Sequence, residues 1–217
     1  QSLVRLAQAY FLSRDPQRAE ACVSAIESCL ASPDRTDTGG PETGFRLISW
    51  CWALVLLRDA ETLTRVRFTV MADVIRQHAS RLAAPKRPTT PSTQITVDAL
   101  ALFYVAALFP DFPESDRWRE LAAHLLVTEC ERQVHPDGVH FEQSTCFQRY
   151  ATDVYLHFLL LAERVGIDVP ALVSERVQRM LEFVLAIRMP DGTVPSIGDS
   201  DGGSLLPLTL RSTADSR

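Results

Sequence analysis

Residues 45–57 have the sequence FRLISWCWALVLL, which is apolar on nearly every side when wound as a helix. A helix without a polar face has to be buried all round. Residues 95–108 are again mostly apolar, whereas residues 63–75 carry apolar side chains at helical spacing with polar ones between them. Such alternation suits antiparallel helical hairpins in a ring, because the inner layer is packed on both sides and the outer layer keeps one face in water. The sequence predicts an all-α protein, an incomplete α/α toroid; a helical solenoid fits the alternation too, but no short repeat is visible.

About eight helices are predicted, separated by breaks that contain glycine or proline. We expect them near residues 3–10, 19–30, 45–57, 63–75, 95–108, 115–134, 147–165 and 173–184. Ser115 is expected to cap the sixth helix, and residues 85–91, with three prolines, form a connector. We divide the chain into a toroid domain, 1–189, and a segment rich in Pro, Gly and Asp, 190–217.

Composition excludes several classes of protein. With 46% hydrophobic and 23% charged residues the chain is an ordinary globular protein, and its net charge of −5 argues against a nucleic-acid binder. No apolar run approaches the ~20 residues of a membrane-spanning helix. The five cysteines form no CxxC motif and do not predict a disulfide framework. Because no signal peptide is visible and both ends look cut, the expected soluble protein is either cytoplasmic or periplasmic.

Polar and aromatic side chains gather most densely in residues 137–155, where a loop leads into a helix. Helix starts collect unsatisfied N–H groups and accept anions, so this stretch is a candidate binding site. Judged by residue type alone, Ser144 or Glu142 also fits a purely structural role, as a residue that caps the helix.

The same stretch resembles the heparinase II/III-like N-terminal domain. Five segments agree with the family in the correct order. They are Glu42, Arg46 and Trp50; residues 98–110 with Trp118; residues 133–138; Phe141–Ser144 with Arg149–Tyr150; and Gly192 with residues 195–201, which include Asp199 and Asp201. The resemblance covers roughly residues 1–205.

That resemblance implies a lyase that cleaves an acidic, uronate-containing polysaccharide by β-elimination, with a C-terminal β-sandwich following the toroid. A base removes the C5 proton of the uronate, an acid protonates the leaving oxygen, and the carboxylate has to be neutralised. The matching catalytic positions are Gln94, Phe147, Gln148 and Tyr150. The substrate-binding positions are Arg46, Glu142, Ser144 and Arg149.

The chain departs from the family pattern at its proton-transfer positions. Gln94 stands where histidine is expected, and Phe147 stands where tyrosine is expected. A phenylalanine has no titratable proton and a glutamine is no base, so activity is reduced, changed or lost. Tyr150, one turn beyond Phe147, is the nearest phenol, but one turn displaces the hydroxyl by ~5 Å.

Other candidate chemistry is weakly supported. The histidines lack metal-ligand spacing, and His135 and His140 are expected to be exposed turn residues. Residues 199–202 resemble part of a calcium loop without its later glutamate. Cys146 fits a small apolar filler better than a nucleophile. We therefore expect neither a metal nor a cofactor. Arg46, inside an apolar helix, needs an acidic partner or an opening to a cleft, and Glu142 is a plausible partner.

Three functions follow. The first is a lyase domain acting on an acidic polysaccharide, with Gln94 and Phe147 limiting its activity. The second is a non-catalytic glycan-binding or exopolysaccharide-pathway protein that uses the same cleft. The third is a helical scaffold without a sugar ligand. The first two require residues near 94 and residues 142–150 to share one hollow.

Overall fold

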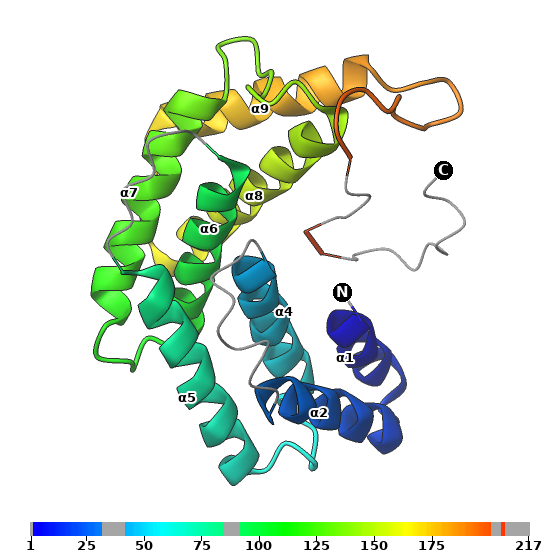
Figure 1. The fold of residues 1–217 in the computed structure, drawn as a ribbon, viewed down its shortest axis with the longest axis vertical. Coiled ribbons are helices and arrows are strands. Elements are labelled where there is room, and N and C mark those ends of the chain that lie inside the picture. Colours follow the sequence, from blue (N-terminus) through cyan, green and yellow to red (C-terminus); the bar gives the residue numbers. More distant parts are fainter. Residues whose placement is uncertain (1, 32–41, 85–91, 201–204, 207–217) are drawn as a thin grey trace.

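The computed structural model describes residues 2–31, 42–84, 92–200 and 205–206 (Figure 1). The described residues form helices joined by turns, with one isolated β-bridge between Val134 and His140. The helices are α1 (Ser2–Ser13), α2 (Pro16–Ala31), α4 (Glu42–Leu57), α5 (Arg65–Leu82), α6 (Thr93–Leu108), α7 (Ser115–Gln133), α8 (Thr145–Val165) and α9 (Ala171–Ala186). Each predicted helix is present, and the all-α prediction is confirmed; α5 continues seven residues beyond the expected range 63–75 and ends at Leu82.

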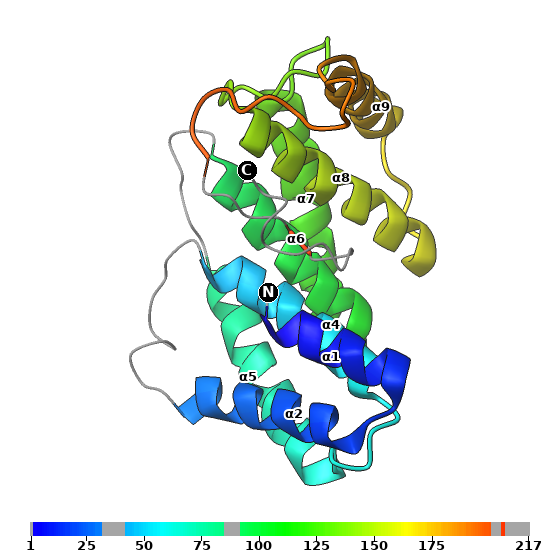
Figure 2. The ribbon, with the colours of Figure 1, turned by 90° about the vertical axis from the view of Figure 1, so that its right-hand side faces the viewer.

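The helices form two layers of a partial ring, as an α/α toroid requires (Figures 1 and 2). Helices α4, α6 and α8 lie side by side in the inner layer, with α1 next to α4. Helices α2, α5, α7 and α9 cover them from outside. Helix α6 is buried along almost its whole length, whereas α9 buries a single stripe of three residues, Val173, Val177 and Met180.

The three inner helices run parallel, because contacts recur in the same order along each of them. Near their starts, Gly44 of α4 lies against Val97 and Asp98 of α6. Further along, Trp52 of α4 donates a hydrogen bond to Tyr104 of α6. All three helices therefore begin at one rim of the ring.

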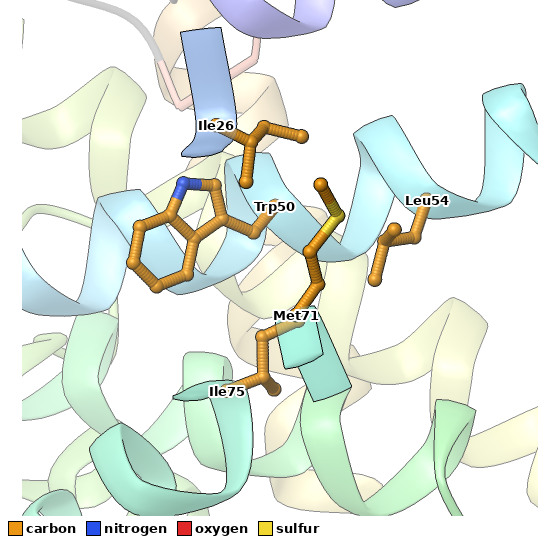
Figure 3. A pocket seen from close by; sticks show the side chains of 5 residues that line it. All are labelled: Ile26, Trp50, Leu54, Met71 and Ile75. Carbon is orange, nitrogen blue, oxygen red and sulfur yellow. The ribbon is translucent and has the colours of Figure 1, made fainter. Parts of the chain in front are cut away.

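The outer helix α5 packs on α4 and α2 through a tight apolar cluster. Figure 3 shows the side chains of Ile26, Trp50, Leu54, Met71 and Ile75 facing one another between these helices. The space they enclose leaves no room for a water molecule. The ring of Trp50 also meets His78 edge-on, with ring centroids 5.4 Å apart. The cluster fixes α5 to α4 by close packing. Arg67 of α5 adds ion pairs to Glu20 and Glu27 of α2 at 2.9 and 3.0 Å.

Local sequence explains four of the helix ends. Thr64, Ser92 and Ser144 cap α5, α6 and α8 by accepting hydrogen bonds from backbone N–H groups of the first turn. Gly166 ends α8 in the left-handed conformation, with φ at 70°. The prediction for Ser115 was wrong: Ser115 is the first residue of α7, and its hydroxyl donates to the carbonyl of Phe109 at 2.5 Å.

Within the described ranges, no helix has the length and apolar character needed to cross a bilayer. The five cysteines are free thiols. Burial raises the pKa of Cys51 and of Cys130 to about 12, so both remain protonated at neutral pH. Cys146 is buried at the start of α8, as expected of a small apolar filler.

Candidate functional site

The two stretches singled out in the sequence meet at the rim where the inner helices begin. Oε1 of Glu142 accepts hydrogen bonds from the backbone N–H of Thr93 at 3.1 Å and from its hydroxyl at 2.7 Å. Glu142 precedes α8, yet its carboxylate satisfies the first turn of α6, next to Gln94. Oε1 of Glu142, which the sequence offers as a partner for Arg46, is thus bonded to Thr93. A negative charge at a helix N-terminus is favourable for the helix dipole.

A buried polar chain supports this rim from below. Nε2 of Gln133 donates to the carbonyl of Ser92 at 3.1 Å and to the carboxylate of Glu129. Glu129, 3% exposed, also pairs with Arg132 at 2.6 Å. Oε1 of Gln133 lies 3.3 Å from Nε2 of His140. The end of α7 is thereby tied to the start of α6.

His140 is buried, contrary to the expectation of an exposed turn histidine. Its side chain is 1% exposed, and burial lowers its pKa to about 4. Because Oε1 of Gln133 can only accept, Nε2 of the imidazole carries the proton. Nδ1 has no hydrogen-bond partner in the described part of the chain. The β-bridge to Val134 turns His140 inward, whereas His135 is exposed as expected.

Gln148 is occupied inside the protein. Its Oε1 accepts from the backbone N–H of His140 at 2.7 Å, and its Nε2 donates to the carbonyl of Gly138 at 2.9 Å. At 2% exposure the side chain does not reach a ligand in this conformation. Gln148 thus holds the loop before α8 in place.

Ser144 is also a structural residue here. Its Oγ accepts from the N–H groups of Cys146 and Phe147 at 3.2 and 3.3 Å, and it donates to the carbonyl of Asp199. The capping interpretation of Ser144 is therefore the one that the geometry supports. The neighbouring Thr145 exchanges hydrogen bonds with the backbone of Ile197 at 3.0 and 3.1 Å.

The segment after α9 thus returns to the rim. Gly198, with φ at 72°, permits this close approach, because a Cβ there would lie 2.8 Å from the carbonyl oxygen of Gln143. Asp199 is described and exposed. Two further positions of the resemblance are not described: Asp201 lies outside the described residues, and the side chain of Glu42 is outside the description.

Aromatic rings close the rim between α4 and α8. The ring centroid of Tyr150 lies 5.7 Å from that of Phe45 and 6.2 Å from that of Phe147. Tyr150 is 5% exposed, whereas Phe147 is half-buried. The nearest phenol to the expected tyrosine position therefore lies between two rings rather than at the surface.

Polar groups also lie near the starts of α6 and α4. Nε2 of Gln94 donates to Oδ1 of Asp98 at 2.7 Å, and Gly44 packs against the same oxygen. Arg46 is half-buried. Burial lowers the pKa of His78, and the charges of Arg81 and Arg46 lower it further. Arg149 is exposed. The structure thus brings Gln94, Glu142, Ser144 and Phe147 to one rim.

Three supporting residues were not predicted from the sequence. Thr93, Glu129 and Gln133 carry the hydrogen bonds that join α6, α7 and the loop before α8. Their signal was weak: a Gln and a Glu four residues apart on one helix are usually solvated. Gln133 is 0% and Glu129 is 3% exposed, because tertiary packing buries them. Spacing along one helix does not reveal such burial.

A second polar group crosses all three inner helices further from the rim. Nε1 of Trp52 donates to the hydroxyl of Tyr104 at 3.1 Å, and this hydroxyl lies 2.6 Å from Nδ1 of His157. Since the phenol accepts from Trp52, it donates its own proton to His157. Burial raises the pKa of Tyr104 to about 12 and lowers that of His157.

Metal-ligand chemistry is not visible in the described part of the chain, where no three His, Cys, Asp or Glu side chains cluster suitably. Asp153, on the same helix as Tyr150, has its pKa raised by burial, which Arg149 partly offsets. The rim thus combines amide, hydroxyl and carboxylate groups with aromatic rings.

Paired helices in a partial ring, with polar side chains gathered where the inner helices start, define an α/α toroid domain with a rim site. The chain matches the family described as Heparinase II/III N-terminus over residues 6–212. It belongs to the heparinase II/III-like family of polysaccharide lyases.

Individual relatives agree with this assignment. A heparin-sulfate lyase of Pedobacter heparinus is 33% identical over 99 residues, which are 45% of this chain and 15% of that protein. The crystal structure of heparan sulfate lyase HepC from the same organism has a TM-score of 0.68 at 25% identity, covering 91% of this chain and 33% of that one. Heparinase III, at 18% identity, shares the fold with a TM-score of 0.77, covering 87% of this chain and 30% of its own. The chain thus spans about a third or less of the relatives it matches.

Proposed function

We propose that this chain is the toroid part of a protein that binds an acidic, uronate-containing polysaccharide at the rim where α4, α6 and α8 begin. The observation that carries the proposal is the link from Glu142 to Thr93, because it gathers residues from two distant stretches around one place. Family membership supports the ligand class, since the relatives named above are heparin-sulfate and heparan sulfate lyases. Half-buried Arg46 and exposed Arg149 supply positive charge for a carboxylate.

The cleavage step is the weaker part of the expected function. β-Elimination needs a base for the C5 proton and an acid for the leaving oxygen. Gln94 offers an amide, and its Nε2 is engaged with Asp98, while Phe147 offers an apolar ring. An amide can bind the uronate carboxylate, but binding ground and transition states equally accelerates nothing. We therefore propose a lyase-derived site whose turnover is low or absent.

Tyr150 does not replace the missing phenol in this arrangement. Its ring is held between Phe45 and Phe147, and only 5% of the residue is exposed. A positioned proton transfer requires heavy atoms within hydrogen-bond reach of the sugar. Moving Tyr150 outward would break the aromatic contact that closes the rim.

The experiment is a cleavage assay with a panel of uronate polymers, following the ultraviolet absorbance of the unsaturated product. The double variant Gln94→His with Phe147→Tyr restores the expected proton-transfer groups, and we expect it to gain turnover over the unmodified chain. A matched control, Gln77→His with Phe68→Tyr, makes the same changes on the outer helix α5. A gain of turnover in the α5 control as large as the gain in the rim variant would contradict the assignment of the rim.

A second function is favoured by the substituted residues themselves. A non-catalytic glycan-binding protein, in a surface-glycan or exopolysaccharide pathway, needs the same rim but no proton transfer. Binding of a uronate polymer without product in either double variant would establish this function. Glu142→Ala, which removes the contact with Thr93, is then expected to weaken binding.

A further inference from the structure

A hollow lies between α9 and the turn that joins α7 to α8. Figure 1 shows these two elements at its top. Its volume is about 360 Å³, within the range of pockets that hold small ligands. It is lined by Pro136, Leu172, Glu175, Arg176, Gln178 and Arg179, and we call it the α9 groove. Two of its lining residues are arginines, and one is an acid.

The two guanidinium groups of the α9 groove lack carboxylate partners. Within the described ranges, neither Arg176 nor Arg179 makes an ion pair, whereas Arg67 and Arg76 pair with glutamates at 2.9 and 2.6 Å. Nε of Arg176 is moreover buried with no hydrogen-bond acceptor among these residues. Leaving a buried donor unsatisfied costs free energy, and a shift of the guanidinium toward an anionic oxygen in the groove would recover it.

The turn that contributes Pro136 to the groove is held against α9. Gly138, with φ at 89°, lies so close to α9 that a Cβ would stand 2.4 Å from the backbone carbon of Arg179. The carbonyl of Gly138 also accepts from buried Gln148 at 2.9 Å. A preformed groove binds more tightly because less conformational entropy is lost on binding.

We infer that the α9 groove binds the carboxylate or sulfate group of one unit of an acidic saccharide, apart from the rim site. The planar guanidinium fork matches both groups with paired hydrogen bonds. The polymer class rests on the proposed function, whereas the groove and its unpaired charges do not. The negative charge of Glu175 repels the bound anion, so it lowers the affinity of the α9 groove for the saccharide.

The test is calorimetric titration of the whole chain with three probes: an unsulfated uronate disaccharide, its sulfated form and inorganic sulfate. The double variant Arg176→Gln with Arg179→Gln should weaken the disaccharide that binds by about tenfold. Glu175→Gln should strengthen it. The control, Arg117→Gln with Arg164→Gln, removes the same charge from exposed sites on α7 and α8 and should change little. An equal loss in the control, or no gain with Glu175→Gln, overturns the inference.

The probes identify which group is held. Binding of sulfate and the sulfated sugar alone assigns the groove to sulfate, and equal binding of both disaccharides assigns it to the carboxylate. Hydrogen exchange then separates the groove from the rim. Protection of residues 171–180 supports the α9 groove even if the rim proposal fails. Protection confined to residues 142–150 overturns the groove and leaves the rim proposal standing.

Discussion

At the scale of single residues, His140 shows how a turn position becomes interior. The imidazole is 1% exposed and bonded through Nε2 to Gln133. Burial disfavours the imidazolium form more than the nearby charge of Glu142 favours it, so the pKa of His140 falls to about 4. An unfolded histidine titrates near 6.5. Between the two values the unfolded chain binds a proton that the folded chain does not.

This difference predicts acid sensitivity. Stability rises with pH wherever the unfolded state binds more protons, so His140 should cost stability as the pH falls from about 6.5 to about 4. The variant His140→Gln lacks this titration. Between about pH 7.5 and 4.5 the free energy of unfolding of the unmodified protein should therefore fall by about 2 kcal/mol more than that of the variant. Urea unfolding at both pH values measures the two drops. Equal drops in the two proteins would refute the buried, neutral imidazole.

Gln148 provides a second test at the same scale. Gln148→Ala leaves the N–H of His140 and the carbonyl of Gly138 without their partners inside the protein. We expect a loss of about 2–3 kcal/mol in the free energy of unfolding. Gln178→Ala is the control, since its amide bonds to Glu182 on an exposed face, and it should cost less than about 0.5 kcal/mol. Chemical denaturation distinguishes the two.

At the scale of elements, the start of α8 carries more connections than a usual helix end. Ser144 caps α8 and also binds the carbonyl of Asp199 in the segment after α9. Ser144→Ala should therefore lower the free energy of unfolding by about 2 kcal/mol, more than a simple cap. It should also speed amide exchange in residues 195–199. Ser174→Ala, which removes an exposed bond to Ala171, is the matched control. A loss no larger than in the control would mean that the segment is held elsewhere.

Elements were predictable where local chemistry decides them. The apolar helix at 45–57 and the stop at Gly166 lie where the sequence pattern and a left-handed cap place them, although Val55 is 37% exposed and the helix is not buried all round. Ser115 was mistaken for a cap because a serine before a helix is ambiguous by one residue, and its hydroxyl bonds to Phe109 instead. For the site, proximity of 94 and 142–150 followed from the family pattern, but the Glu142–Thr93 bond did not. Pairs far apart in sequence leave no local signal.

At the scale of the whole molecule, one hydrogen-bonded group joins three inner helices. Tyr104 of α6 binds Trp52 of α4 and His157 of α8. Tyr104→Phe should lower the free energy of unfolding by about 1–3 kcal/mol, because two partners lose their bonds in a partly buried place. Thermal unfolding measures the change. Tyr10→Phe is the control, as its buried ring makes no hydroxyl hydrogen bond within the described residues. Equal effects would show that the group does not hold the ring together.

A missing side chain governs how widely the inner helices separate. At Gly44 a single added carbon would sit 2.9 Å from Oδ1 of Asp98 and 3.1 Å from the carbonyl oxygen of Val97. Such an atom would push α4 and α6 apart at the rim. Because Trp52 and Tyr104 stay fastened further along, α4 and α6 would open as a V hinged on that bond. The lack of a side chain at Gly44 therefore sets how closely α4 and α6 approach at the rim. Enlarging residue 44 is the most direct way to widen the rim for a bulkier polysaccharide.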